Sequence, residues 1–168
     1  MTLYTKFGDE GRTQTFSGET YRKNDLLIEV NGSIDEVMVS IETFRIHITD
    51  EKILKDIDKI YEAMGMLGAE ISSGKTTNLQ KYIVQDFVER LERRIDEIFV
   101  PLQSFQRFYK SESVSCNEVR VRVRKLERLM TSLLLQKSLR PVTFAYINRL
   151  SDYLFALAVH LEKLEIQS

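Results

Sequence analysis

The feature that most constrains the fold is the spacing of apolar residues, which recur at intervals of three and four from residue 32 onward. This spacing puts them on one face of an α-helix, so each stretch is expected to form an amphipathic helix. Five such stretches follow one another, with only 7 glycines and 2 prolines in the whole chain. The pattern predicts an all-α fold, a five-helix antiparallel bundle. The expected helices contain residues 34–44, 53–71, 77–98, 119–133 and 147–164.

Local signals indicate where some of these helices begin and end. Ser33 and Glu36 have the spacing of a capping box, in which the serine hydroxyl accepts the N–H of Glu36 and the glutamate reaches back. The first helix is therefore expected to start at Ser33. The second helix is expected to end near Ser73-Gly74. Residues 103–116 are expected to form the one sizeable irregular connection, and connections between rigid helices often carry function.

The composition is that of a single domain, residues 1–168, which we divide into an N-terminal segment, 1–31, and a helical bundle, 32–168. Its formal net charge of −1 lacks the basic excess that broad nucleic-acid binding requires. Cys116 is the single cysteine, which excludes an internal disulfide and fits a cytoplasmic protein. Cys116, His47 and His160 are too few ligands for a zinc site built from cysteine and histidine. Both histidines are expected to pack at helix flanks. No apolar run approaches the roughly 18 residues of a membrane-spanning helix, so we expect no membrane partner.

The N-terminal segment differs from the rest of the chain. Tyr4-Thr-Lys-Phe-Gly-Asp-Glu-Gly-Arg-Thr-Gln-Thr15 combines two glycines with several hydroxyls and a lysine. Glycine lets backbone N–H groups converge on an anion, and Lys and Thr add donors, so the segment has the ingredients of a phosphate cradle. On these residues alone, a frayed strand or loop is the simpler explanation. The later stretch from Gly68 to Thr76 is not a P-loop, because five residues separate its glycines and a helix precedes it.

Polar residues at helical spacing mark a second candidate region. Two sets each share one helical face: Arg120, Arg124, Glu127 and Arg128, and then Asn148, Ser151 and Asp152. One explanation is a set of interhelical ion pairs, with Asp35, Glu127 and Asp152 matched to the arginines. The other is a polyphosphate site, because guanidinium groups bind phosphate oxygens in bidentate fashion, and carboxylates beside them can orient the arginines or hold Mg²⁺.

Six motifs spread along the chain occur in the order of a known family. They are Tyr4-Thr-Lys-Phe-Gly-Asp-Glu-Gly-Arg-Thr13, Lys23-Asn-Asp25, Gly32-Ser-Ile-Asp-Glu-Val37, Leu67-Gly-Ala-Glu70, Arg124-Lys-Leu-Glu-Arg128 preceded by Arg120, and Asn148-Arg-Leu-Ser-Asp-Tyr153. The last motif is intact and lies at the right distance from Arg124, which makes it quite specific. Through these motifs the chain resembles the PduO-type ATP:cob(I)alamin adenosyltransferases nearly end to end.

The resemblance implies a homotrimer of five-helix bundles, with ATP and Mg²⁺ bound at each subunit interface. The N-terminal segment would wrap the triphosphate, and the polar helix faces would complete the ATP site. Asp35 and Arg120 would form a salt bridge across the interface that positions the site, and together with Arg124 they are the implied catalytic residues. The residues implied to bind ATP are Thr5, Lys6, Gly8, Thr13, Lys23, Arg124, Glu127, Arg128 and Asn148.

The activity implied by the resemblance is transfer of the 5′-deoxyadenosyl group of ATP to cob(I)alamin, giving adenosylcobalamin and triphosphate. Reduced cobalt attacks the 5′ carbon, so the protein needs no general base; it must shield the leaving charge and hold cobalt in line with the carbon. Phe105, in the loop before the fourth helix, would contribute to an apolar wall that displaces the lower axial ligand of cobalt. A corrinoid reductase would be a partner.

The same loop is where the chain departs from the family pattern. The family has Phe-Ile-Leu-Pro-Gly-Gly, whereas this chain has Phe105-Gln-Arg-Phe-Tyr-Lys-Ser111, so the aromatic residue is kept but the turn is missing. Simple loop packing is an alternative role for Phe105 and Phe108. Two other functions stay open for the whole chain: a catalytically weakened or inactive relative that binds ATP or corrinoid as a binding or regulatory module, and a purely structural helical assembly protein.

Overall fold

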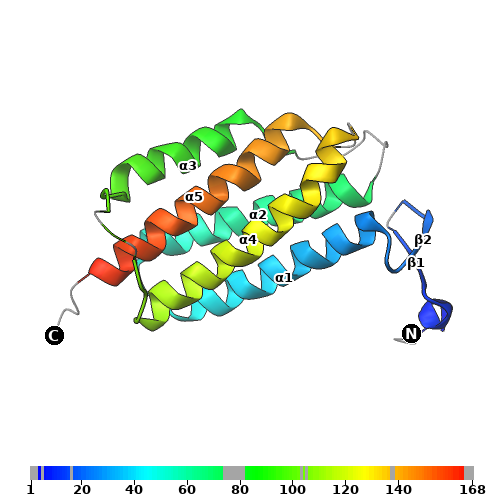
Figure 1. Ribbon diagram of the computed structural model, residues 1–168, viewed down its shortest axis with the longest axis horizontal. Helices are drawn as coiled ribbons and strands as arrows, with labels where there is room; N and C mark the ends of the chain where they lie inside the picture. The colour runs from blue at the N-terminus through cyan, green and yellow to red at the C-terminus, as the bar shows by residue number, and fades with distance from the viewer. Residues whose placement is uncertain are drawn as a thin grey trace.

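A computed structural model of the protein describes residues 4, 6–15, 17–73, 82–102, 104, 106–136 and 139–164. Five long helices dominate this part of the chain, which confirms the predicted all-α bundle (Figure 1). Their bounds are α1 Leu26–Ile46, α2 Glu51–Ser72, α3 Gln85–Ile98, α4 Ser111–Leu135 and α5 Pro141–Lys163.

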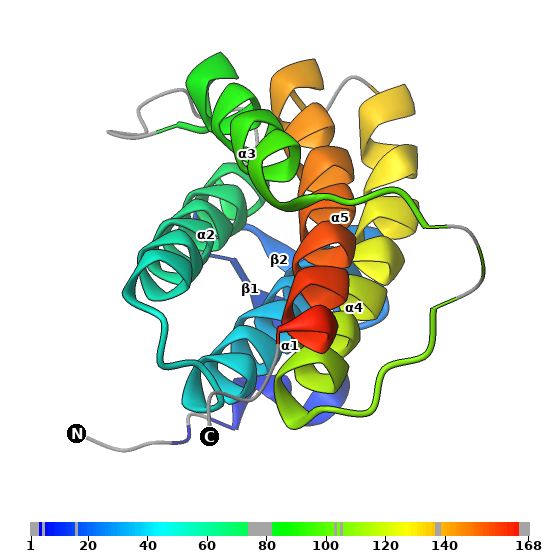
Figure 2. The ribbon, with the colours of Figure 1, turned by 90° about the vertical axis from the view of Figure 1, so that its left-hand side faces the viewer.

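The helices pack side by side in the spatial order α3, α5, α4, α1 and α2 (Figure 2). Neighbouring helices run antiparallel, except for α3 and α5, which run in the same direction (Figure 1). Because α4 lies between α5 and α1, its apolar face is buried on both sides. The predicted seam of α4 is confirmed, since four of its members have no exposed surface: Val119, Val123, Leu126 and Met130.

A polar cluster connects α2 and α3 to α5. Asp56 of α2 accepts a hydrogen bond from Nε of Arg94 in α3 at 2.7 Å and another from the hydroxyl of Tyr153 in α5 at 2.9 Å. The side chains of Arg94 and Asp56 are only 10% and 16% exposed. Since α2 packs mainly against α1 and α3 mainly against α5, this cluster is a direct link between the two outer helices.

The first helix begins about two turns earlier than the capping box predicted. Helix α1 starts at Leu26, and Ser33 lies inside it, buried and with no hydrogen-bond partner for its hydroxyl. The expected start was wrong because the local capping signal competes with tertiary packing. Val30 is fully buried one turn before Ile34 and extends the apolar face toward the N-terminus. The expected boundary at residue 31 therefore falls within α1.

The other helix ends agree with the sequence to different degrees. Helix α2 ends at Ser72, with Ser73 as its C-cap, as predicted. Helix α3 begins at Gln85, so the prediction was wrong for residues 82–84, where Val84 is the extended N-cap; the earlier part of the expected range, 77–81, lies outside the described residues. Helix α4 begins at Ser111, so the irregular connection is shorter than the predicted 103–116. Among the helices that the structure describes, none combines the length and apolarity needed to cross a membrane.

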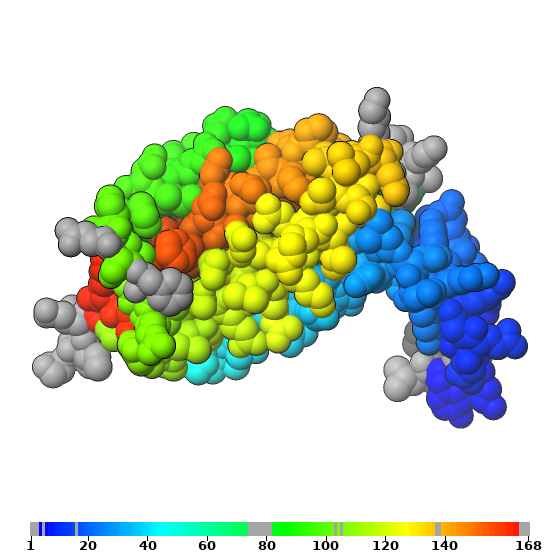
Figure 3. Space-filling model, viewed as in Figure 1, coloured from blue at the N-terminus to red at the C-terminus, as the bar shows by residue number. Residues whose placement is uncertain are grey.

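The N-terminal segment folds into a short 3₁₀ helix, η1 Phe7–Glu10, and an antiparallel hairpin of β1 Arg12–Gln14 and β2 Thr20–Arg22. Gly11 and Gly18 have φ angles of 77° and 84°, which glycine adopts readily. Figure 3 shows this segment standing away from the bundle, beyond the N-terminal end of α1. The segment is thus a defined hairpin rather than a frayed strand.

Candidate functional site

The turn between η1 and the hairpin brings together two of the residues predicted to bind phosphate. Gly11 N–H donates to the carbonyl of Gly8 at 3.2 Å, and Lys23 N–H donates to the carbonyl of Gly11 at 2.9 Å. The ammonium of Lys23 consequently lies across Gly8, where a β-carbon would come within 3.1 Å of Nζ. Glycine at position 8 therefore leaves the space that the lysine occupies. Lys6, with φ of 62°, is the N-cap of η1 and has an exposed side chain.

The hairpin register adds two cations that the sequence analysis did not single out. Arg12 lies directly opposite Arg22, whereas Thr13 lies opposite Tyr21 on the other face of the ribbon. Like charges directly opposite each other destabilise a strand pair. Within the described residues neither guanidinium has an ion pair, and both line an open hollow of about 360 Å³ with Thr20, Tyr21 and Asp25. The hairpin therefore carries two guanidinium groups on one face, with the carboxylate of Asp25 beside them.

The arginines of α4 lie on an accessible face of the bundle. Arg124 and Arg128 are exposed, and Arg120 is half-buried over the ring of Phe155, with 5.6 Å between its guanidinium carbon and the ring centroid. Nε of Arg120 donates to Oδ1 of Asn117 at 2.8 Å. Burial and then the nearby charge of Arg124 lower the pKa of Arg120. The face thus holds positive charges that repel one another.

The carboxylates expected to pair with these arginines have other partners or none. Glu127 accepts a hydrogen bond from the amide of Asn148 at 2.8 Å, and Asp152 pairs with Arg149 at 2.7 Å. Asp35 is exposed on α1. In the part of the chain that the structure describes, Arg120, Arg124 and Arg128 have no ion pair with a carboxylate, whereas Arg122, the fourth arginine of α4, pairs with Glu118. The predicted matching of Asp35, Glu127 and Asp152 to these arginines is therefore not what the structure shows; the ion pairs between α4 and α1 are instead those of Arg122 and Lys125 with Glu36.

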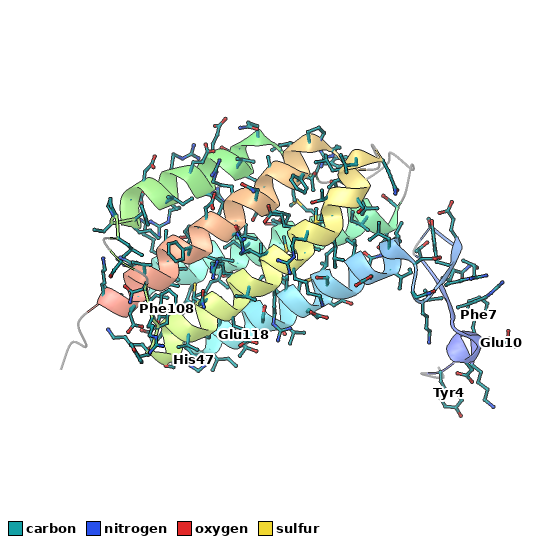
Figure 4. All side chains as sticks on the ribbon, in the orientation of Figure 1. Tyr4, Phe7, Glu10, His47, Phe108 and Glu118 are labelled. Atoms are coloured by element: carbon teal, nitrogen blue, oxygen red, sulfur yellow. The ribbon has the colours of Figure 1, made fainter. Side chains whose placement is uncertain are left out.

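The structure does not bring every predicted residue together in one chain. Thr5 and Phe105 lie outside the described residues. Phe108 is partly buried against the core near the start of α4, at the end of the bundle opposite to Tyr4, Phe7 and Glu10 (Figure 4). The cradle and the loop before α4 are therefore at opposite ends of the same molecule.

Comparison with known proteins identifies the family to which this site can be related. The sequence model of the family described as cobalamin adenosyltransferase matches residues 3–161. The corrinoid adenosyltransferase of Citrobacter freundii is 30% identical over 162 residues, covering 93% of this chain and 92% of its own length. The corrinoid adenosyltransferase PduO of Salmonella typhimurium is 31% identical over 164 residues, covering 94% of this chain, which spans only 49% of that relative.

Solved structures confirm the fold independently. A variant of a PduO-type ATP:corrinoid adenosyltransferase from Lactobacillus reuteri, complexed with cobalamin and ATP, superposes with a TM-score of 0.85. The match covers 96% of this chain and 93% of that chain at 22% sequence identity. At this level of identity the likeness shows a shared fold.

Proposed function

The chain belongs to the cobalamin adenosyltransferase family, and from this premise we propose that it transfers the 5′-deoxyadenosyl group of ATP to cob(I)alamin. The observation that carries the proposal is the α4 face with Arg120, Arg124 and Arg128, which have no carboxylate partner in the described part of the chain. Repulsion among unpaired guanidinium groups is relieved when a polyphosphate binds them.

The reaction needs positioning and charge stabilisation more than acid–base chemistry. An electron pair of Co(I) attacks the 5′ carbon of ATP, the Co–C bond forms, and the bond from that carbon to oxygen breaks. The bonding electrons leave with the triphosphate, so negative charge grows on the oxygen that departs. Arg124, Arg128 and Lys23 would lower the barrier by neutralising this charge, and Asn148 would fix Glu127 beside them.

Mg²⁺ fits this site as a companion of ATP. The described residues contain no group of three or more histidine, cysteine or carboxylate side chains that could hold a metal alone. Mg²⁺ is commonly held by substrate phosphates with one or two carboxylates. Glu127 is the carboxylate on the arginine face and would be the protein group nearest to such an ion; the ion would supply further charge neutralisation.

We place the nucleotide between two copies of the chain in a homotrimer. Support comes from the separation of the N-terminal segment and the loop before α4 at opposite ends of one molecule (Figures 1 and 4). Further support comes from apolar side chains left exposed on the adjacent helices α1 and α4, such as Val39 at 61% and Val121 at 52%. Asp35 of one copy would pair with Arg120 of the next.

The remaining parts of the proposal concern the cellular setting. Co(I) must be generated by a reductase, so a corrinoid reductase is the partner that the chemistry requires. We place the reaction in the cytoplasm, a reducing compartment with which a single free cysteine, Cys116, is consistent.

An anaerobic assay tests the activity. Purified protein is mixed with ATP, Mg²⁺ and chemically reduced cobalamin, and light-sensitive adenosylcobalamin is followed by its absorption spectrum. We expect product from the native protein, at least a hundredfold less from Arg124→Ala, and an unchanged rate from Arg93→Ala, an exposed arginine of α3. Absence of product from the native protein, with ATP still raising its melting temperature, would instead favour a nucleotide-binding relative that lacks the transfer.

A further inference from the structure

The start of helix α4 is held by a residue from a distant part of the chain. Its N-cap residue, Lys110, makes no side-chain capping hydrogen bond. Backbone N–H groups at a helix start require acceptors, and most helices supply one from the N-cap side chain. Here the acceptor comes from Glu162, in the last turn of α5.

One carboxylate oxygen of Glu162 accepts hydrogen bonds from several donors. Its Oε2 accepts the backbone N–H of Tyr109 at 3.0 Å and that of Lys110 at 3.3 Å, and the Ser113 hydroxyl also donates to it. These hydrogen bonds lower the pKa of Glu162, and the one from Ser113 has the largest effect. The group is therefore ionised at neutral pH. Hydrogen bonds to an ionised acceptor are stronger than neutral ones.

A second contact fastens the same point. The ammonium of Lys110 donates to the carbonyl of Leu164, the residue that ends α5. A cation is favourable at the C-terminus of a helix, where carbonyl groups lack partners. The end of the loop before α4, residues 106–110, is therefore fixed over the last turn of α5 by two contacts that span more than 50 residues of sequence.

The loop fixed in this way presents apolar and aromatic surface. Phe108, next to the anchored N–H groups, packs partly buried against the core. Exposed apolar side chains occur at both ends of the loop and next to it: Phe99, Val100, Tyr109 and Val114, which are 40%, 55%, 76% and 47% exposed. Figure 2 shows the connection from α3 to α4 passing across α5 before it reaches the start of α4. A flat, largely apolar macrocycle is the kind of ligand that such a surface fits.

We propose that Glu162 is a positioning residue for the corrinoid, which anchors residues 106–110 at the end of the loop before α4 so that Phe108 and Tyr109 form part of one wall of the corrinoid site. The inference rests on the proposed function. It explains how this chain fixes the loop without the Pro-Gly-Gly turn of the family pattern. Glu162 acts through the loop and has no contact of its own with the reacting atoms.

The test compares Glu162→Ala and Glu162→Gln with Asp58→Asn, a control that removes an exposed carboxylate of α2 paired with Arg45. Affinity for cob(II)alamin in the presence of ATP is measured by absorption, and hydrogen exchange of residues 106–114 reports on the loop. We expect Glu162→Ala to weaken cobalamin binding by about tenfold and to speed exchange in the loop, with ATP affinity unchanged. Glu162→Gln keeps one oxygen acceptor, so its cobalamin affinity should lie between those of the native protein and Glu162→Ala. Asp58→Asn should have the cobalamin affinity and the exchange rate of the native protein.

The outcomes separate this inference from the proposed function. Weakened cobalamin binding with unchanged ATP affinity supports the positioning role even if the native protein proves to lack turnover, which would overturn only the proposed function. Equal cobalamin affinity of Glu162→Ala and the native protein would overturn the positioning role. Equal losses of ATP and cobalamin affinity would also overturn it, since they would indicate general damage to the fold. A native protein that binds no cobalamin would overturn both.

Discussion

Removal of the Asp56 carboxylate should lower the free energy of unfolding of the bundle more than removal of any exposed carboxylate. In Asp56→Ala, Arg94 loses a charge-assisted hydrogen bond of 2.7 Å, and the Tyr153 hydroxyl loses its 2.9 Å acceptor. A hydrogen bond to a charged group contributes about 1.5–3 kcal/mol, and a buried hydroxyl left without a partner costs about 1–3 kcal/mol. Because Arg94 keeps Glu97 as a partner, we expect a total loss of about 3–5 kcal/mol.

Urea unfolding followed by circular dichroism measures this loss directly. For a chain of this length the melting temperature should fall by roughly 10 °C, at about 2–4 °C per kcal/mol. Tyr153→Phe should cost only about 1 kcal/mol, because Asp56 keeps Arg94, and the double variant should be non-additive. The control Asp58→Ala breaks an exposed ion pair with Arg45 and should cost at most about 1 kcal/mol. A loss for Asp56→Ala no greater than that of the control would refute the reasoning.

Three further predictions address the cradle, α2 and the anchor of the loop. Gly8→Ala should raise the KM for ATP several-fold in steady-state assays, because the new methyl group displaces Nζ of Lys23; an unchanged KM would show that Lys23 does not contact the nucleotide. Gly65→Ala should stabilise the protein by about 1 kcal/mol in urea unfolding, because Gly65 is an exposed mid-helix position with no atom in the way, and a destabilised variant would contradict this. The pKa of Glu162 is lowered in the folded protein, so its contribution to stability is present above the pKa of the unfolded chain and is lost as pH falls through the folded value; melting temperatures of the native protein and Glu162→Gln should converge on acidification, and a constant difference would exclude this linkage.

The sequence predicts most of the helical architecture because apolar periodicity is local information. The seam of α4 is buried as its spacing indicates, and α2 ends at the expected serine. The start of α1 was wrong because burial of Val30 depends on α4 and other helices, which no local capping motif reports. Sequence reasoning identifies an element more securely than its ends.

The candidate site also has residues that the sequence could predict and residues that only the structure reveals. Lys23 and Gly8 could be selected by residue type, and their proximity is a consequence of the turn between them. The sequence shows which residues of a strand share a face, but it does not give the hairpin register. Arg12 and Arg22 could therefore not be recognised as a pair. Glu162 carries no motif at all, because its role depends on contacts with residues about 50 positions away.

The most direct test of the account is whether two inactive variants restore each other. If ATP lies between the N-terminal segment of one copy and α4 of another, Lys23→Ala and Arg124→Ala damage different sides of the same site. Co-expressed under two affinity tags and purified as mixed trimers, they should regain about a third of the native rate of adenosylcobalamin formation, since one of the three interfaces in every mixed trimer receives both intact sides. Hybrids that stay as inactive as either variant alone, beside an active native protein, would contradict a site shared between copies.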